Sequence, residues 1–370
     1  MIIQSIRTAG FRNLTSHRIE LSPQVNAFIG LNAQGKSNLL EAVSVLSDGR
    51  SFRGARLPDM ICYNGMESAV EGVVCSGNEE DSLKVHLNRT QRRFFVNDVR
   101  VSDLRGFLGK LSYVVFSSET MAVIDGEPRA RRDFMDHGCF SIRPLFLLSL
   151  RNYKRVLKSR NVTLKTDTRN RNLISTWDPS LCRFAVSIAL ARRQYLNSIS
   201  VEAARIHSEL TGGRESLETV YLTEWFNIDH PLVDQSEYLE TCLKDCLEKD
   251  IDLDIRRGCT MSGPHRDDMM IRINGKDARM FGSRGQKRTA VLALKLAEIS
   301  VFHHTVNEYP VLLLDDIASE FDDKRQKELL RSIPEKIQVI ISHTGRLNGF
   351  FLTVPRYFNV TDGLTTPCPQ

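Results

Sequence analysis

Residues 30–37 form a glycine-rich segment that fits the phosphate-loop pattern G-x-x-x-x-G-K-[S/T], with Gly30, Gly35, Lys36 and Ser37 at the fixed positions. A β-rich run, VNAFIG, leads into the segment, and an amphipathic helical pattern, SNLLEAVSVL, follows it. Backbone N–H groups and the positive end of the helix dipole would therefore converge where phosphates bind. We expect Lys36 to lie between a β- and a γ-phosphate and the Ser37 hydroxyl to ligate Mg²⁺, so the expected cofactors are ATP and Mg²⁺.

Two adjacent carboxylates, Asp315 and Asp316, close the apolar run that begins at Val311. Successive residues of a strand point to opposite faces, so we expect the two carboxylates to leave the strand end in opposite directions. We assign Asp315 to the Mg²⁺ shell and Asp316 to polarising the attacking water. Alone, the run would fit any buried strand that leads into a turn. Together with the phosphate loop, it predicts hydrolysis of a nucleoside triphosphate.

A second helix start with free N–H groups is predicted in the segment FGSRGQKR, ahead of the helical pattern TAVLALKLAEI. Ser283 is a natural N-cap, so the backbone N–H groups that follow it point toward a potential anion. A capped core helix would give the same pattern. If the first loop wraps its own nucleotide, the second can cap the γ-phosphate of a nucleotide held by another copy of the chain.

The composition is that of a globular protein, with 41% hydrophobic and 26% charged residues in 370, which excludes wholesale disorder and fibrous repeats. No apolar run is long enough to span a bilayer, and the first residues lack the apolar core of a secretory signal. Eight cysteines contain no C-x-x-C pair, and Cys242 and Cys246 fit half-buried small side chains better than a metal site. We therefore expect a cytoplasmic protein without a membrane partner.

The net charge of +5 is small, but the basic residues are clustered between Arg129 and Arg171, whereas residues 234–254 carry eight acidic side chains and only two lysines. Clustered Lys and Arg are typical of a surface that neutralises nucleic-acid phosphates, although a solvated face gives the same pattern. The predicted DNA contacts, four on the helical segment and two on a predicted β-meander, are Lys154, Arg155, Lys158, Arg160, Arg92 and Arg93.

The elements around these residues predict two lobes. Residues 1–120 and 255–362 read mainly as strands, with tight hairpins at Asn97-Asp98 and Asn274-Gly275, and they end with a strand, a helix over KRQKELLRSI and a strand. Residues 121–254 are dominated by helical periodicity, with a helix start at Pro128. We expect a mixed α/β head, a helical arm inserted into it, and a flexible tail over residues 363–370.

The segments GLNAQGKS, GSRGQ, VLLLDD followed by SEFD, and SHT together resemble the ABC-type ATPase head shared with the SMC chromosome-maintenance proteins. The segments AGFRNL, SFRGARLPDMI, FSSETMAVIDGEPRARRDFMD and GPHRDD narrow the resemblance to the RecF recombination mediator family, across nearly the whole chain. The resemblance implies an α/β fold, namely an ABC-type P-loop ATPase head (a mixed sheet with an antiparallel β subdomain) plus an inserted compact helical lobe.

The resemblance also implies roles for single residues. Arg12 would help to hold the nucleotide, Asp315 and Asp316 match the acidic pair with Asp in place of the usual catalytic Glu, and Asp322 closes a loop at the dimer interface. His343 lies where ABC ATPases carry a histidine that senses the γ-phosphate. The nucleotide cradle would comprise Gly30, Asn32, Gly35, Lys36, Ser37 and Asn38. The signature loop would comprise Ser283, Gly285 and Gln286.

Two positions depart from the family pattern. Ala33 replaces a glycine that is common in the RecF loop, and Ser118-Glu119 stands where a Pro-Glu pair is expected. Neither change removes a charge from the site.

The function implied by the resemblance is slow, DNA-stimulated ATP hydrolysis by a homodimer that forms on ATP, clamps gapped DNA or a single-strand to double-strand junction, and releases it on hydrolysis. The implied partners are RecO, RecR and the recombinase, in recombinational repair, replication restart and the SOS response to DNA damage. The alternative is an ABC-type ATPase of defence or transport that acts on a protein partner without DNA. The long separation between Lys36 and Ser283 does not fit a transporter domain, and the chain lacks the heptads of long-armed SMC proteins.

Overall fold

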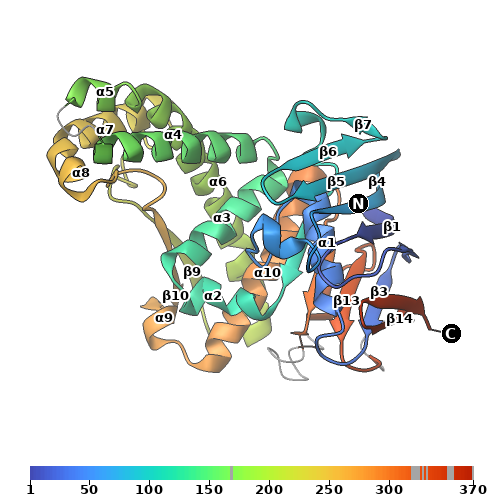
Figure 1. Ribbon diagram of the computed structural model, residues 1–370. Helices are drawn as coiled ribbons and strands as arrows, with labels where there is room; N and C mark the ends of the chain where they lie inside the picture. Colours follow the sequence, from blue (N-terminus) through green and yellow to red (C-terminus); the bar gives the residue numbers. More distant parts are fainter. Residues whose placement is uncertain (167–169, 318–325, 327–328, 331, 348–353, 369–370) are drawn as a thin grey trace. The chain divides into compact units, whose positions relative to one another are not determined.

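The computed structural model describes residues 1–166, 170–317, 326, 329–330, 332–347 and 354–368 (Figure 1). The chain divides into two compact units, one of Met1–Met121 with Arg288–Gln370 and one of Ala122–Lys287. Both ends of the chain belong to the first unit, so the second unit is an insertion in its sequence.

A six-stranded, mostly parallel sheet in the first unit has the order β15-β14-β3-β13-β12-β8, with only β15 antiparallel to its neighbour. Its strands are β3 (Val25–Ile29), β8 (Tyr113–Phe116), β12 (Val311–Asp315), β13 (Val339–His343), β14 (Arg356–Thr361) and β15 (Leu364–Pro367). Every residue of β12 is buried, as expected for a parallel strand covered on both faces. Because β3 and β12 are both parallel to β13, their carboxyl ends meet at one edge of the sheet.

A second six-stranded sheet in this unit is antiparallel, with the order β2-β1-β4-β5-β6-β7. Its strands are β1 (Ile2–Ala9), β2 (Arg18–Glu20), β4 (Glu67–Ser76), β5 (Glu79–Asn88), β6 (Arg92–Val96) and β7 (Val99–Arg100). The hairpin predicted at Asn97-Asp98 is confirmed, since both residues have the positive φ (50° and 63°) that a type I′ turn requires.

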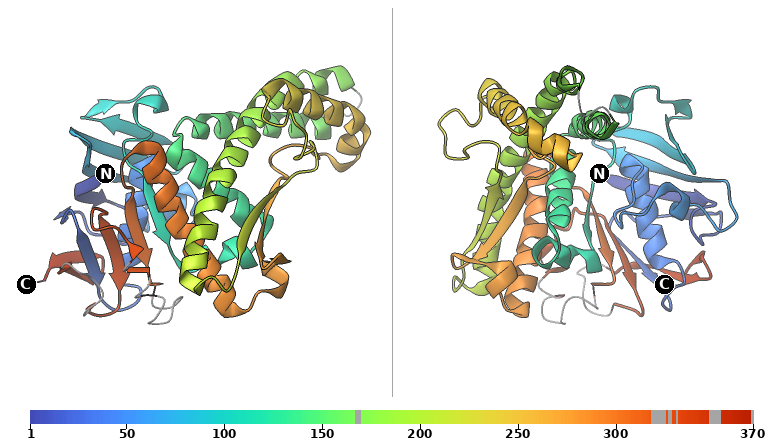
Figure 2. Two further views of the ribbon diagram at one scale, coloured as in Figure 1. Left: turned by 180° about the vertical axis from the view of Figure 1, so that it is seen from behind. Right: turned by 60° about the vertical axis from the view of Figure 1, so that its left-hand side comes forward.

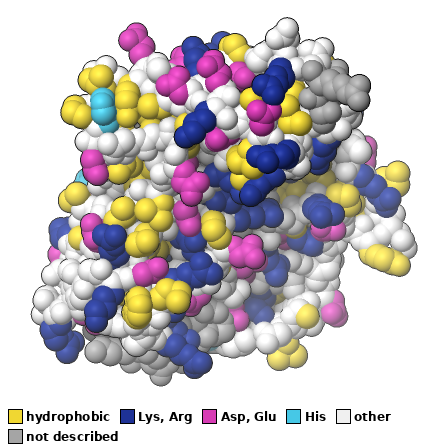
Figure 3. Space-filling view, turned by 90° about the vertical axis from the view of Figure 1, so that its left-hand side faces the viewer, with side chains coloured by type: hydrophobic (Ala, Val, Ile, Leu, Met, Phe, Trp, Pro, Cys, Tyr) yellow, Lys and Arg dark blue, Asp and Glu magenta, His cyan; other side chains and the backbone are white. Residues whose placement is uncertain are grey.

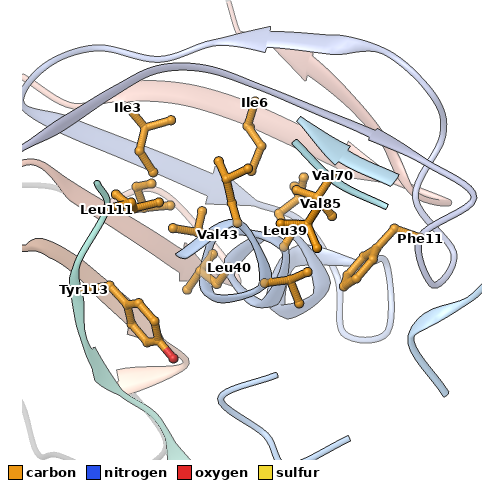
Figure 4. Close-up of a cluster of buried hydrophobic side chains, with 14 of the residues drawn as sticks. Ile3, Ile6, Phe11, Leu39, Leu40, Val43, Val70, Val85, Leu111 and Tyr113 are labelled. Atoms are coloured by element: carbon orange, nitrogen blue, oxygen red, sulfur yellow. The ribbon is translucent and has the colours of Figure 1, made fainter. Parts of the chain in front are cut away.

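Helix α1 (Lys36–Asp48) contacts strands of both sheets, including β4 and β13. Its Leu39, Leu40 and Val43 belong to one buried cluster with Ile3 and Ile6 of β1 (Figure 4). The side chain of the buried Gln338 links the sheets as well, because its amide exchanges two hydrogen bonds with the backbone of Ile3. This packing fixes the start of α1, and with it the loop that precedes the helix.

The second unit consists mainly of helices around α6 (Asp178–Thr211), which packs against α3, α4, α7 and β9 (Figure 2). The other helices are α2 (Ala122–Asp125), α3 (Pro128–Ile142), α4 (Phe146–Thr166), α5 (Arg171–Ser175), α7 (Ser236–Lys249), α8 (Ile251–Arg257), α9 (Ala278–Phe281) and α10 (Arg284–Val306), which continues into the first unit. A three-stranded antiparallel sheet joins β9 (Leu217–Leu222), β10 (Asp268–Ile273) and β11 (Lys276–Asp277). The helix start at Pro128 and the hairpin at Asn274-Gly275 are as predicted.

Two segments differ from the sequence expectation. Residues 255–287, expected in the head, belong to the second unit because β10 pairs with β9 along its whole length. The expected flexible tail instead forms β15, because Asp362 and Gly363 adopt positive φ (48° and 77°) and turn the chain back onto β14.

The helix expected over residues 324–333 lies largely outside the described residues. Within the described part of the chain, no helix combines the length and apolarity that crossing a membrane requires.

Candidate functional site

The loop between β3 and α1 has the backbone of a phosphate cradle. Gly30 and Gly35 have φ of 156° and 110°, and a Cβ on Gly30 would lie 2.4 Å from the carbonyl oxygen of Val360. Glycine is therefore required at both positions. Ala33, at the position where the family commonly has glycine, has φ of 65°, a left-handed conformation that costs an alanine about 1 kcal/mol.

Lys36 is the buried cation of this loop, with 8% of its surface exposed. Its ammonium donates hydrogen bonds to the carbonyl oxygens of Gly30 (2.8 Å) and Leu31 (2.6 Å). Burial lowers the pKa of Lys36, and the negative charges of Asp316 and Asp315 oppose that shift. The loop thus holds the ammonium among oxygen acceptors, a place that phosphate oxygens can take over.

Ser37 and Asp315 meet at the strand edge as the metal assignment requires. The Ser37 hydroxyl donates to Asp315 Oδ1 at 2.6 Å, and the Ser342 hydroxyl donates to the same oxygen at 2.7 Å. Neighbouring ligands of an octahedral Mg²⁺ lie about 3 Å apart, so the Ser37 and Asp315 oxygens fit one coordination sphere. Mg²⁺ is commonly bound by one or two protein ligands together with phosphate oxygens and water molecules, and Ser37 and Asp315 would supply the protein ligands.

Asp316 leaves the strand with a left-handed backbone (φ 49°), and its N–H donates to Ser342 Oγ at 3.0 Å. This conformation ends the strand alternation expected for the pair, and both carboxylates act on Lys36. Asp316 opens onto a cavity of about 300 Å³, the phosphate-loop pocket. The pocket is lined by Asn32, Ala33, Gly35, Lys36, Ser37, Asn38, Arg53, Asp316, Ser342, His343 and Thr344.

The phosphate-loop pocket brings together most of the residues assigned to the nucleotide, including His343 at the end of β13. Arg12 and Gly30 are not part of its lining. The Arg12 guanidinium instead forms a two-pronged ion pair with the fully buried Glu41 of α1, at 2.7 and 2.9 Å. Arg12 therefore braces the helix behind the loop.

Arg53, Glu119 and Ser342 lie near this site and were not assigned a role from the sequence. Arg53 lines the pocket and donates to Asn38 Oδ1 at 3.3 Å. It lies in the SFRGARLPDMI segment, which contributes to the family resemblance but contains no motif that predicts a role for a single residue. The pKa of Glu119 is raised, first by partial desolvation and then by the negative charges of Asp315 and Glu41, while Arg53 lowers it. Glu119, which follows the departing Ser118, is thus electrostatically coupled to the site.

The signature loop belongs to the second unit, whereas the phosphate-loop pocket belongs to the first. Ser283 caps α10 as predicted, with the Gln286 N–H donating to its hydroxyl (3.2 Å) and the Ser283 N–H donating to the side-chain Oε1 of Gln286 (2.9 Å). The Gln286 amide also donates to Glu215 at 2.9 Å. The predicted residues therefore form two separate sets, and Asp322 lies outside the described residues.

The predicted DNA contacts are exposed, with one exception. Arg92 and Arg93 lie on β6, and Lys154, Arg155 and Lys158 lie on the exposed face of α4. The prediction for Arg160 was wrong. Its guanidinium is fully buried and contacts carboxylates of Asp178 (2.8 Å) and Asp254 (2.6 Å).

The reason for the Arg160 error is helical periodicity. Arg160 shares a face of α4 with the buried Val156 and Leu164, four residues to either side, and this face packs inward. Its charge is therefore compensated inside the unit and does not reach the surface.

Comparisons with known proteins identify the family of the chain and its fold. Residues 2–348 match the family model described as the RecF/RecN/SMC N-terminal domain. The DNA replication and repair protein RecF of Listeria monocytogenes serotype 4b (strain CLIP80459) is 35% identical over 349 residues, 93% of each chain. A structure of the recombination mediator protein RecF with ATP in the RecFOR pathway is 32% identical, covers 100% of this chain and 98% of its own, and has a TM-score of 0.89.

A more distant structure, an Smc head bound to the C-winged helix domain of ScpA, is similar in fold alone. It is 15% identical, covers 100% of this chain and 97% of its own, and has a TM-score of 0.56. The predicted fold class, an ABC-type ATPase head with an inserted helical lobe, is confirmed.

Proposed function

The chain belongs to the RecF family, and from this premise we propose that it is a DNA-binding ATPase that dimerises on ATP, clamps DNA and opens on hydrolysis. The observation that supports this most strongly is the meeting of Lys36, the Ser37–Asp315 pair and Asp316 at one strand edge. ATP is the nucleotide in the similar RecF structure, and Mg²⁺ suits the oxygen ligands at this edge.

The residues of the site divide the work of phosphoryl transfer. Lys36 would compensate charge on the β- and γ-phosphates, while Ser37 and Asp315 would hold a metal ion that could neutralise the developing negative charge. Asp316 accepts a hydrogen bond from the attacking water and so orients it. The buried hydroxyl of Ser342 fixes the Asp315 carboxylate and the backbone of Asp316, since it donates to Asp315 Oδ1 and accepts from the Asp316 N–H.

The dimer would complete each active site with the signature loop of the second chain. Ser283 is exposed at the start of α10, where the helix dipole favours a negative charge. The capping contacts of Ser283 and Gln286 hold this helix start in a defined shape. A γ-phosphate held by one chain would therefore be capped by the Ser283 end of its partner.

DNA is the proposed binding partner, either gapped DNA or a junction between single-stranded and double-stranded DNA. The exposed cations on β6 and α4 can neutralise its phosphates. We also propose that the protein acts with RecO and RecR to deliver a recombinase to DNA. This would take place in the cytoplasm, in recombinational repair and replication restart. The similar RecF structure is named for the RecFOR pathway, which supports these partners.

The first experiment measures ATP hydrolysis and particle mass with and without gapped duplex DNA. We expect slow hydrolysis that DNA stimulates, and a doubling of mass with ATP. Lys36→Ala is the matched negative control, because it removes the cation that faces the phosphates. If DNA leaves the rate of ATP hydrolysis unchanged, the result would contradict DNA as the binding partner and favour a protein partner.

The second experiment tests the shared active site by mixing Lys36→Ala with Ser283→Arg. Each variant alone should be inactive, since Ser283→Arg places bulk and positive charge at the helix start that must approach the partner's nucleotide. Random pairing makes about half of the dimers mixed, and each mixed dimer keeps one intact site, so about a quarter of the activity should return. No recovery at any ratio, with ATP binding by Ser283→Arg intact, would count against the composite site.

A further inference from the structure

The second unit contains a cavity of about 250 Å³ that the proposed function does not use. We call it the arm pocket, and it is lined by Arg129, Arg132, Asp133, Asp136, Leu150, Tyr153, Lys154, Ile188, Arg192, Pro264 and His265. These residues come from α3, α4, α6 and the GPHRDD segment that precedes β10. Figure 3 views the side of the molecule on which Lys and Arg side chains gather near the centre of the face.

The lining of the arm pocket is positively charged. It contains four cationic and two carboxylate side chains. His265 adds no charge at neutral pH, because burial lowers its pKa to about 4. The formal net charge of the lining is therefore +2, which attracts an anion into the cavity.

Arg192 and Arg132 are the inner cations of the arm pocket. Arg192 is 2% exposed and donates to Asp136 (2.8 Å) and to the carbonyl oxygen of Pro264 (2.7 Å). Arg132 is half-buried beside it, and its Nη1 donates to the backbone carbonyl of Asp267 (2.9 Å). Burial and the charge of Arg192 lower the pKa of Arg132, so a bound anion would relieve repulsion between the two guanidinium groups.

The wall of the arm pocket is fixed by buried hydrogen bonds. Tyr153 Oη and His265 Nδ1 lie 2.6 Å apart, and His265 Nε2 lies 3.0 Å from the carbonyl oxygen of Thr260. A carbonyl oxygen can only accept, so Nε2 carries the proton and Nδ1 accepts from the tyrosine. Trp225 Nε1 donates to the buried Asp267 at 3.0 Å and holds the same segment. Arg132 and Arg192 are thus presented by a framework that is already ordered.

We propose that the arm pocket binds a phosphate group, through Arg132 and Arg192 inside it and through Arg129 and Lys154 at its rim. Guanidinium groups match the oxygen geometry of phosphate, and a cavity of this volume accepts one or two phosphate groups. The source of the group is either a phosphodiester of DNA or a free phosphate ion. The phosphate site rests on the pocket alone, whereas the DNA source rests on the proposed function.

The test for the phosphate group is titration calorimetry with inorganic pyrophosphate on the full chain carrying Lys36→Ala, so that the phosphate loop does not contribute. We expect saturable binding that Arg132→Gln or Lys154→Gln weakens about tenfold. Arg151→Gln is the matched control, because Arg151 is an exposed cation of α4 outside the lining and should leave the affinity unchanged. No binding, or equal affinity in all variants, would overturn the proposal, and the exposed Lys154 keeps the test valid if Arg132→Gln does not fold.

The source of the phosphate is decided by duplex DNA binding to the parent chain and to the same variants. If DNA is the source, Lys154→Gln and Arg132→Gln each lower affinity and reduce the magnitude of the log–log salt slope by about 0.9, whereas Arg151→Gln does not. If pyrophosphate binding falls while DNA affinity stays constant, the ligand is a free phosphate ion. A parent chain that binds pyrophosphate but no DNA would overturn the proposed function and leave the phosphate site standing.

Discussion

The phosphate-loop pocket and the arm pocket both contain cationic side chains, but they are built in different ways. The first is made from consecutive loop residues whose backbone is shaped by Gly30 and Gly35, with one buried lysine and two carboxylates from the next strand edge. The second is made from side chains of three helices and a distant segment, with two arginines inside it. The first can therefore select a metal-bound triphosphate by geometry, whereas the second attracts phosphate by charge.

The largest effect that separates the two pockets is expected from Lys36→Ala. Removing the buried ammonium that would face the β- and γ-phosphates should weaken ATP binding by about a hundredfold or more, with loss of hydrolysis. Pyrophosphate binding at the arm pocket should survive. Calorimetry with ATP checks the first statement, and Lys276→Ala on the exposed β11 hairpin is the control. ATP affinity equal to that of the control would refute the phosphate-loop assignment.

The second effect tests whether the buried ion-pair network of Arg160 stabilises the arm. Arg160→Met leaves the buried Asp254 without its ion partner, so we expect the second unit to lose about 3–5 kcal/mol of unfolding free energy. Lys158→Met, two residues away on the exposed face, should change it by less than about 0.5 kcal/mol. Urea unfolding followed by helical circular dichroism measures both. Similar values for the two variants would mean that the Arg160 network is not structural.

How far the sequence could predict each pocket follows from how each is built. The phosphate loop is a local pattern, so its fixed residues, the strand before it and the helix after it were predictable from eight positions in a row. The partner carboxylates were also predictable, because parallel strands bring their carboxyl ends to one edge. Ser342 was not assigned a role, because its hydrogen bond to Asp315 depends on the pairing of β13 with β12, in which Ser342 lies opposite Asp315.

The arm pocket and the burial of Arg160 could not be predicted from the sequence, because they depend on contacts between residues far apart in the chain. The sequence shows a cluster of basic residues, but composition does not say which of them face inward. The burial of Arg160 could be predicted only by knowing which face of α4 packs against the rest of the unit. The pairing of β10 with β9 moved residues 255–287 into the second unit, although nothing local in that segment signals its partner. Positive φ at Asp362 placed β15 where a loose tail was expected.

The third prediction concerns pH and is specific to the arm pocket. The pKa of His265 is lowered to about 4, mainly by burial and also by the charges of Arg266, Arg132 and Arg192, against about 6.5 in the unfolded chain. The unfolded state therefore binds more protons between these values, so stability is full above pH 6.5 and falls as the pH drops toward 4, by about 3 kcal/mol at most. Urea unfolding of the second unit across this range measures the loss.

The matched variants for this pH effect are His265→Gln and His304→Gln. His265→Gln lowers stability at every pH, because it perturbs the contacts with Tyr153 and Thr260, but it should remove most of the slope between pH 6.5 and 4. The exposed His304 should leave the slope unchanged when replaced. A slope that persists in His265→Gln would assign the acid sensitivity to the carboxylates instead.

The smallest predicted effect compares the backbone of the two pockets. Ala33→Gly in the phosphate loop relieves a left-handed alanine, and although glycine adds freedom to the unfolded chain, the net change should stabilise the first unit by about 0.5 kcal/mol. Gly263→Ala beside the arm pocket should act in the opposite direction, because φ is 126° there and a Cβ would lie 2.7 Å from the Tyr153 hydroxyl. Thermal and urea unfolding of both variants gives the two signs. Destabilisation by Ala33→Gly would mean that the alanine methyl makes contacts that outweigh its backbone strain, and the loop would then owe its shape to packing as well as to glycine.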